Sequence, residues 1–209
     1  DTELRGVVRA AGSEASIGNA EVLLFIAWSS GSSWPLYQPT EVKQELERTR
    51  TDSEGGFVLP IASWRRGAML RVQAPGFATG YASAGWPAAE VAERGLEFSL
   101  QPSAALSGTV VGATKGLTVT LHETHGASLS VETDPEGRFM LDDLPAGIPF
   151  EVRLLLPAPE GVDDEDFTRR ERRVGLLAEA LVLEPGEHRL VAWNAPQLCV
   201  VRGSVRVAE

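Results

Sequence analysis

A nine-residue pattern that occurs twice constrains the fold of this chain more than any other feature. Residues 51–59 read TDSEGGFVL and residues 133–141 read TDPEGRFML, so both follow T-D-x-E-G-x-F-x-L. A polar turn with glycine between two half-buried runs is typical of a β-hairpin, because glycine reaches the positive φ that such turns need. Phe and Leu, two apart, share one face of the following strand. The pattern predicts two hairpins in equivalent positions.

The spacing of other landmarks extends the pattern into a repeat of whole domains. Gly6 and Gly108 lie in similar β-type runs 102 residues apart, whereas Thr51 and Thr133 are 82 apart, so the first copy is about 20 residues longer. We assign the excess to an inserted loop over residues 28–47. A repeat of about 100 residues is a domain rather than a solenoid unit, so each copy should bury its own core.

Each copy contains about seven short β-type runs separated by turn signals, which is the pattern of an antiparallel β-sandwich. The run over residues 20–28 is apolar on both faces and suits a central strand. Residues 40–47 are expected to form a short helical turn and residues 87–94 a single short helix. Residues 101–103 are expected to be a linker, and the turn at residues 185–187 a further hairpin.

The second copy resembles the carboxypeptidase regulatory-like domain. The resemblance rests on Ser107–Val110, Thr133–Leu141, Leu144–Gly147 and the run Phe150–Leu156. The first copy matches at residues 6–8, 51–59 and 71–77, and it departs from the family at residues 60–64, where L-P-x-G should stand. The resemblance implies a transthyretin-like seven-stranded sandwich. The shared motifs are structural in that family, so no catalytic residue is carried over.

The predicted fold is therefore all-β: two tandem seven-stranded antiparallel β-sandwiches, transthyretin-like or Ig-like, with at most short helical turns. The first sandwich is expected over residues 1–103 and the second over 104–197. Residues 198–209 either close the second sandwich or begin a third unit, because Gly203 is a third copy of the landmark glycine.

Composition excludes several classes of partner. With 29 acidic against 19 basic residues the net charge is −10, which disfavours nucleic acid and anionic membrane surfaces. No apolar run approaches the roughly 20 residues that span a bilayer.

Cys199 stands alone in an apolar run and is expected to be a small buried hydrophobe. The chain begins at Asp1 rather than Met, which fits a mature or trimmed chain and does not by itself indicate export.

Two aromatic residues are the candidate ligand-binding residues. Trp34 and Tyr37 lie in the inserted loop that only the first copy has, among Ser and Gly residues. Exposed aromatic side chains on sandwich loops bind sugars or peptides; the alternative is that they fold over the sandwich and cover its core. The expected partner is a protein, with carbohydrate as the second candidate.

Metal ligands are expected to be absent. Asp163, Asp164 and Asp166 are weak calcium candidates, because hard cations bind clustered carboxylates. The run lacks the glycine-punctuated spacing of calcium loops and is followed by four arginines, so a solvated, self-neutralising loop is preferred. His122 and His125 lack a third zinc ligand at suitable spacing. We expect no cofactor.

Two chemistries known on sandwich folds have partial matches. Residues 202–204 are similar to the Y-R-G-S ending of hydroxyisourate hydrolases, which share the transthyretin-like fold, but Val201 replaces the tyrosine and no histidine stands near Gly6. Lys115 and Asn194 correspond nominally to the Lys–Asn isopeptide pair of pilin-like sandwiches, yet Lys115 lies in a Gly-flanked turn where burial is not expected. No G-x-S-x-G elbow occurs. The chain is therefore expected to be a non-catalytic module of a larger exported or cell-surface bacterial protein, acting as a spacer, assembly or interaction domain.

Overall fold

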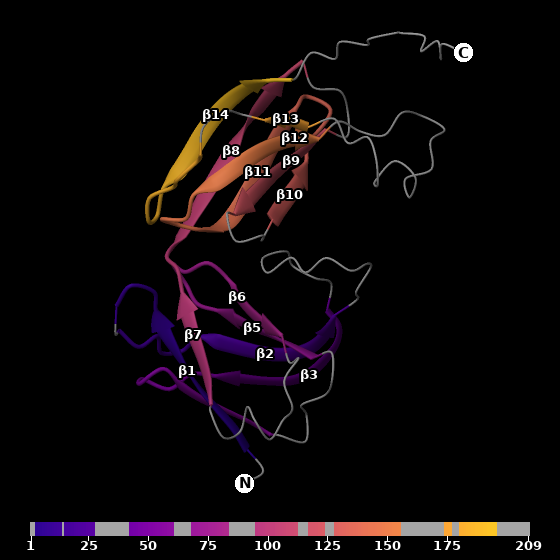
Figure 1. Ribbon diagram of the computed structural model, residues 1–209. Coiled ribbons are helices and arrows are strands. Elements are labelled where there is room, and N and C mark those ends of the chain that lie inside the picture. Colours follow the sequence, from indigo (N-terminus) through magenta and orange to yellow (C-terminus); the bar gives the residue numbers. More distant parts are fainter. Residues whose placement is uncertain are drawn as a thin grey trace, which may run out of the picture.

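The computed structural model describes residues 3–13, 15–27, 42–60, 68–83, 95–112, 117–123, 128–155, 174–176 and 180–195, and all regular structure within them is β (Figure 1). The first seven strands are β1 (Glu3–Ala10), β2 (Glu21–Ala27), β3 (Val42–Arg50), β4 (Gly56–Pro60), β5 (Ala68–Gln73), β6 (Gly80–Ser83) and β7 (Leu96–Leu100). The next seven are β8 (Ser103–Val111), β9 (Thr118–Glu123), β10 (Ser128–Glu132), β11 (Arg138–Pro145), β12 (Phe150–Leu155), β13 (Val174–Leu176) and β14 (His188–Asn194).

These strands form four sheets in two similar sets. The earlier strands make a three-stranded sheet in the order β4-β1-β7 and a four-stranded sheet in the order β3-β2-β5-β6. The later strands make β11-β8-β14 and β10-β9-β12-β13, the same orders with each label raised by seven. The described pairings are antiparallel except for β1 with β7 and β8 with β14, which are parallel. In Figure 1 the two sets lie one above the other, with the chain passing between them from β7 to β8.

Each set encloses a separate hydrophobic core. One cluster of buried side chains draws on β1 to β7, with Leu4, Leu59 and Leu70 among its largest members. The other draws on the later strands, with Leu106 and Phe150 among its largest. Cores of this kind need two sheets packed face to face, as in a β-sandwich.

Strand β2 is central and buried on both faces, which confirms the prediction for its described residues. Val22 and Leu24 belong to the first core. Leu23 and Phe25 alternate with them along the strand; they are only 1% and 0% exposed, and they are not part of that cluster. Neighbours β3 and β5 pair with it on either side. An uninterrupted apolar run is what such a strand requires.

The T-D-x-E-G turn joins strands of different sheets, so the predicted hairpin is wrong in both copies. β3 pairs with β2 and β4 pairs with β1; likewise β10 pairs with β9 and β11 with β8. Each motif is a corner that carries the chain from the four-stranded to the three-stranded sheet. A hairpin and a corner have the same sequence pattern of strand, polar turn and strand. The pattern does not distinguish them, because the alternation of side chains does not show which strand is the pairing partner.

A carboxylate holds the first corner. Asp52 Oδ1 accepts hydrogen bonds from the backbone N–H groups of Glu54 and Gly56, each at 2.8 Å. The N–H of Asp52 in turn donates to the carbonyl of Gly56 at 2.8 Å. Gly55 supplies the left-handed residue with φ 77°. An aspartate side chain thus replaces the backbone partners that a hairpin ladder would have provided.

The second corner repeats this arrangement. Asp134 Oδ1 accepts from the N–H of Glu136 at 3.0 Å and of Arg138 at 2.8 Å. The Asp134 N–H donates to the Arg138 carbonyl at 2.9 Å, and Gly137 has φ 78°. The Asp and Gly that the two copies of the motif share therefore form the same hydrogen-bonded turn in both.

The threonine that opens each motif is buried, at 6% exposure in both copies. Thr51 Oγ1 donates to the carbonyl of Ile17 at 2.7 Å and accepts from the N–H of Ala20 at 2.8 Å. Thr133 Oγ1 is buried and has no hydrogen-bond partner among the described residues. Leaving a buried hydroxyl unpaired is unfavourable, so the second corner is the less well satisfied of the two.

The phenylalanine of each motif lies against the landmark glycine. Phe57 is the register partner of Gly6, and Phe139 is the partner of Gly108. A Cβ built on Gly6 would overlap Phe57 Cζ, and one on Gly108 would lie 3.1 Å from Phe139 Cε1 and 2.6 Å from Val191 Cγ2. The ring thus occupies the space that a side chain on the central strand would fill, which explains why the two motifs occur together.

Two further local predictions are wrong. Residues 42–47 belong to strand β3 rather than to a helical turn, so the loop expected over 28–47 does not extend beyond residue 41. Pairing with β2 overrides the helical preference of its Glu, Lys and Gln residues. The turn at Gly186 is not a hairpin either: Leu181 bridges to Phe150 of one sheet, whereas β14 pairs with β8 of the other. The helix expected over 87–94 lies outside the described residues.

Replacing Gly108 by Ala is expected to destabilise the second half by about 2 kcal/mol or more, because the new methyl group meets Val191 and the ring of Phe139. Urea unfolding followed by Trp fluorescence measures this. Thr109→Ala on the same strand is the matched control and should cost less than half as much. Equal midpoints for the two variants would contradict the role given to the glycine.

Replacing Asp134 by Ala removes a cap from two backbone N–H groups, with an expected loss of about 1–2 kcal/mol. Thermal unfolding measures the effect. Asp142→Ala, also an exposed aspartate of the second half, is the control and should leave the melting temperature within a degree or so. A corner that does not depend on its carboxylate would give the two variants the same melting temperature.

Candidate functional site

Residues 101–103, expected to be a linker, form a hydrogen-bonded junction between the two halves. The N–H of Ala78 donates to the carbonyl of Gln101 at 2.8 Å, and the N–H of Ser103 donates to Gly76 at 3.0 Å. Pro102 makes a β-bridge with Phe77 and its carbonyl accepts from the N–H of Ala146 at 2.9 Å. The connection is therefore tied to the loop between β5 and β6 of the first half and to the end of β11 of the second.

A carboxylate adds a further contact across this junction. Asp143 lies at a bulge of β11, where the register shifts between Leu141 and Leu144, and it has φ 62°. Both of its carboxylate oxygens lie 3.1 Å from the N–H of Thr79, just before β6. A non-glycine residue in the left-handed region is uncommon, although Asp tolerates it better than most. The bulge turns this side chain toward the other half.

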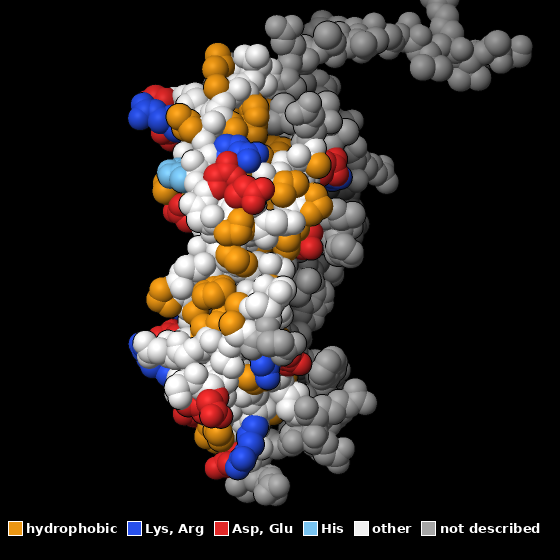
Figure 2. Space-filling model, turned by 90° about the vertical axis from the view of Figure 1, so that its left-hand side faces the viewer, with side chains coloured by type: hydrophobic (Ala, Val, Ile, Leu, Met, Phe, Trp, Pro, Cys, Tyr) orange, Lys and Arg blue, Asp and Glu red, His pale blue; other side chains and the backbone are white. Residues whose placement is uncertain are grey.

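A groove opens beside the junction, and it is the candidate functional site. It has a volume of about 280 Å³ and lies between β6 and β7, which are the edge strands of the two sheets of the first half. The lining residues come from both strands and from the end of β11: Ala78, Thr79, Gly80, Tyr81, Ala82, Glu97, Phe98, Ser99, Leu100, Gln101 and Pro145. Figure 2 shows hydrophobic side chains gathered at the level where the two halves meet, with charged ones above and below.

The groove shifts the pKa of one of its titratable side chains, Tyr81. Burial raises the pKa of the Tyr81 hydroxyl, the negative charge of Asp143 raises that pKa further, and the positive charge of Arg71 opposes both. The phenol therefore stays protonated and can donate a hydrogen bond near neutral pH. Glu97, 71% exposed, lies on the opposite wall and forms an ion pair with Arg9 at 3.7 Å.

The residues predicted from the sequence to bind a ligand or a metal do not include those of the groove. Trp34, Tyr37, Asp163, Asp164 and Asp166 all lie outside the described residues. The groove lies between two edge strands, and the position of a strand at a sheet edge leaves no signature in the side-chain pattern. Asp143 carried one signal, an aspartate pair directly before L-P-A-G, because Asp is enriched at positions with positive φ.

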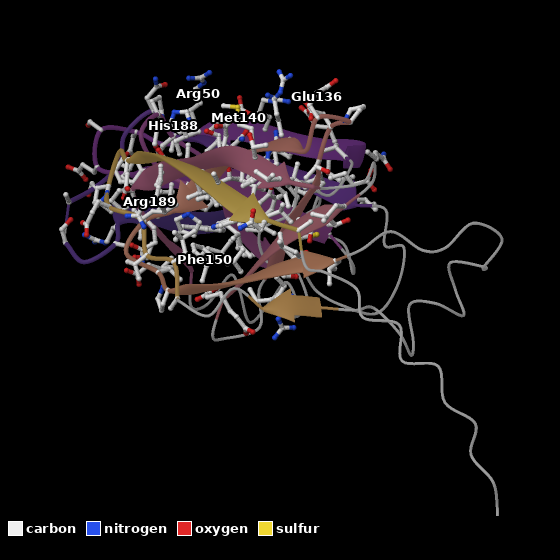
Figure 3. All side chains as sticks on the ribbon, turned by 90° about the horizontal axis from the view of Figure 1, so that it is seen from above. Arg50, Glu136, Met140, Phe150, His188 and Arg189 are labelled. Carbon is white, nitrogen blue, oxygen red and sulfur yellow. The ribbon has the colours of Figure 1, made fainter. Side chains whose placement is uncertain are left out.

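A second surface lies on the outer face of β11-β8-β14. Ser107 Oγ and His188 Nε2 are 2.9 Å apart, and the exposed fractions of Met140 and Leu190 are 54% and 80%. Figure 3 shows His188 and Met140 on this outer side, whereas Phe150 points between the sheets. A Ser–His pair needs an orienting acid and an oxyanion-binding site for nucleophilic catalysis. The described residues place neither beside this pair.

His122 is paired with charged neighbours rather than with metal ligands. It lies on β9 opposite Glu151 of β12, and Arg153 holds Glu151 with bonds of 3.2 and 3.0 Å. Burial and the charge of Arg153 lower the pKa of His122, while Glu151 raises it. Within the described ranges there is no group of three or more His, Cys, Asp or Glu residues that can hold a metal ion.

Most residues of the other predicted chemistries lie outside the described part of the chain. Asn194 is exposed at the end of β14, which does not provide the buried setting that an isopeptide bond requires. Lys115, His125, Cys199 and the RGS stretch at 202–204 lie outside the described residues. No helix in the described part of the chain is long and apolar enough to cross a membrane.

Comparison with known proteins gives only distant likenesses. No protein-family model matches the chain, and no curated protein matches it either. Among solved structures, the Bacillus anthracis TIE protein is similar at 14% identity and TM-score 0.31, over 92% of this chain and 33% of that one. A streptococcal ancillary pilin is similar at 14% identity and TM-score 0.28, over 93% and 62%. The chain thus spans about a third of the first and less than two thirds of the second.

A further likeness is to a C-terminal fragment of the pilus adhesin SpaC from Lactobacillus rhamnosus GG, at 10% identity and TM-score 0.25, over 95% of this chain and all of that one. TM-scores and identities this low do not establish a common fold. The all-β architecture described above rests on the strand order of this chain.

Removing the Asp143 carboxylate is expected to loosen the junction. In Asp143→Gly the positive φ is retained without strain, so only the contact with Thr79 is lost. The amide of Thr79 should then exchange with solvent about tenfold faster, the effect of one charge-assisted hydrogen bond. Asp143→Asn, which keeps one acceptor oxygen, should lie between wild type and Asp143→Gly. Unchanged exchange in both variants would show that the contact does not form in solution.

The environment of His122 predicts a loss of stability in mild acid. The pKa of His122 in the folded protein lies below its ordinary value of 6.5, so between the two values the unfolded chain binds more protons. The free energy of unfolding should therefore fall as the pH drops through this window. In His122→Gln this part of the pH dependence should disappear, as measured by urea unfolding between pH 7.5 and roughly pH 5. The same slope in both proteins would refute the assignment.

Proposed function

We propose that this chain is a non-catalytic module of a larger exported or cell-surface bacterial protein, where it serves as a spacer and as an assembly or protein-interaction unit. The observation that carries this proposal is the junction. The Ala146–Pro102 hydrogen bond and the Asp143–Thr79 contact join the second half to the first, and two more backbone hydrogen bonds and a β-bridge hold residues 101–103 against the loop before β6. A flexible linker would have none of them, whereas a spacer gains from a fixed angle between its parts.

The direction of the chain supports the same role. Within each half the first and last strands are parallel neighbours, so the chain leaves each half at the end opposite to its entry. Successive units of this kind extend along a line.

We propose that each half is a seven-stranded, transthyretin-like sandwich, with boundaries at 1–103 and 104–197. The stretch 198–209, with Gly203 in place of Gly108, is proposed to be the closing strand or the opening of a third unit.

The absence of catalysis is part of the proposal. The Ser107–His188 pair is exposed on an open sheet face, and the groove beside β6 and β7 contains no nucleophile paired with a base. A protein partner is the proposed ligand class. Carbohydrate, through Trp34 and Tyr37, stays a prediction from the sequence, since no described residue bears on it.

Small-angle scattering and residual dipolar couplings test the spacer role. One alignment tensor should fit the amides of both halves of the wild-type protein, and the fit should become poorer in Asp143→Gly, which lacks one of the junction contacts. Two independent tensors in wild type would reject a rigid spacer. The location is tested by protease treatment of intact source cells: a surface module is cleaved from outside, whereas a protein within the cytoplasm survives.

A further inference from the structure

We propose that the groove between β6 and β7 is a binding site for an extended peptide strand of a partner protein, and that the strand carries basic side chains. The inference deepens the proposed assembly role by naming its site, and it rests on that role. The groove is walled by two strand edges and floored by the side chains of Phe98 and Leu100, an arrangement suited to main-chain recognition rather than to a compact small molecule.

The backbone of β7 points hydrogen-bonding groups into the groove. The carbonyl of Leu100 accepts from the N–H of Ala11, on the β1 side, whereas the next carbonyl, of Gln101, accepts from Ala78, on the groove side. Successive residues of a strand point their backbone groups to opposite sides. The N–H and C=O groups of Glu97 and Ser99 therefore face the groove, where the described residues offer them no backbone partner.

The outer edge of β6 presents backbone N–H and C=O groups in the same way, and one of them, the N–H of Thr79, already has a partner. β6 pairs with β5 on one side, and the N–H of Thr79 points to the other side, where Asp143 accepts it at 3.1 Å. The carboxylate thus takes the place that a carbonyl of an added strand would occupy. Tyr81, two residues further along, directs its backbone groups the same way without such a partner among the described residues. An edge left open in this manner is a template for strand addition.

The dimensions of a sandwich suit one inserted strand. Paired strands lie about 4.8 Å apart, roughly half the 10 Å between packed sheets, so one added strand fits in the groove against either edge and extends that sheet. The edges come together at the junction, through the Ala78–Gln101 bond, and this closes one end of the groove. Gly80 faces the side chain of Leu100, since an added Cβ would lie 2.6 Å from its Cδ2, so the floor has no room for a further side chain.

Charge selects the occupant. Glu97 is 71% exposed on one wall, and Asp143 is exposed at the closed end. Arg9 lies 3.7 Å from Glu97 and offsets part of its charge, and Arg71 lies 3.9 Å from Glu21. The Asp143 carboxylate is therefore the negative charge of the groove that no described Lys or Arg pairs with. With a net charge of −10 for the whole chain, an acidic or neutral strand gains no electrostatic attraction here, whereas one with Lys or Arg does.

Two peptides of about seven residues, long enough to follow β7 from end to end, serve as probes. One reads Thr-Lys-Val-Thr-Val-Lys-Thr, and the other carries Glu in place of both Lys. In titrations followed by amide NMR shifts, the Lys peptide should saturate the shifts of Tyr81, Glu97 and Ser99. The Glu peptide should bind at least tenfold more weakly.

A matched pair of variants separates the backbone from the side chain. Ser99→Pro removes the N–H that faces the groove, and proline is tolerated on a free strand edge, whereas Ser99→Ala keeps it. Ser99→Pro should weaken binding of the Lys peptide about tenfold, the effect of one hydrogen bond, and Ser99→Ala should leave it unchanged. Amide spectra of both variants establish that they are folded.

Several outcomes would overturn the proposal. These are no saturable binding of the Lys peptide, shifts that map to another surface, equal affinity for both peptides, or equal affinity of Ser99→Pro and Ser99→Ala. Concentration-dependent dimers that Ser99→Pro abolishes would assign the groove to a second copy of this chain instead. None of these results bears on the single alignment tensor expected of a rigid spacer, so the site and the spacer role can fail separately.

Discussion

The contact of a phenylalanine ring with a glycine of the neighbouring strand is the constraint on which each half depends. The central strand of the three-stranded sheet, β1 or β8, must accept a strand on either side and still leave space for the ring that comes from β4 or β11. Only a residue without a side chain satisfies both demands. The ring in turn fixes the register of the strand that follows the corner, and a one-residue shift would turn its apolar positions toward solvent. One glycine thereby couples the two motifs that the sequence repeats.

Most of the local strand pattern could be predicted, because alternation and turn residues are properties of short stretches. The burial of β2 on both faces follows directly from one such stretch, the apolar run over residues 20–28. The corners could not be predicted as corners, because a chain that crosses between sheets and one that folds back on its neighbour use the same turn chemistry. Likewise, residues 42–47 have helix-forming side chains, and only the neighbouring β2 makes them a strand. These failures share one cause: the partner strand is distant in sequence.

The candidate site was beyond reach for a different reason. Its walls are two strands at sheet edges, and the backbone groups that such an edge offers are the same for nearly every residue type. Which edges stay open depends on strand order, which is a property of the complete topology. Trp34 and Tyr37 are predicted as ligand-binding residues from side-chain type and from their place in an inserted loop. Asp143, by contrast, owes its role to a bulge that turns it toward the other half.

The parallel pairing of first and last strands has a mechanical consequence. A pull on the two ends of a half acts on these neighbours in opposite directions along their length, so their bonds are sheared together instead of being opened one after another. In the later half seven residue pairs share such a load, from His188 with Ala105 to Asn194 with Val111. In the earlier half the ladder from Gly6 with Leu96 to Ala10 with Leu100 has five. Under tension the earlier half should yield first, and the later half would keep the chain attached while it does so.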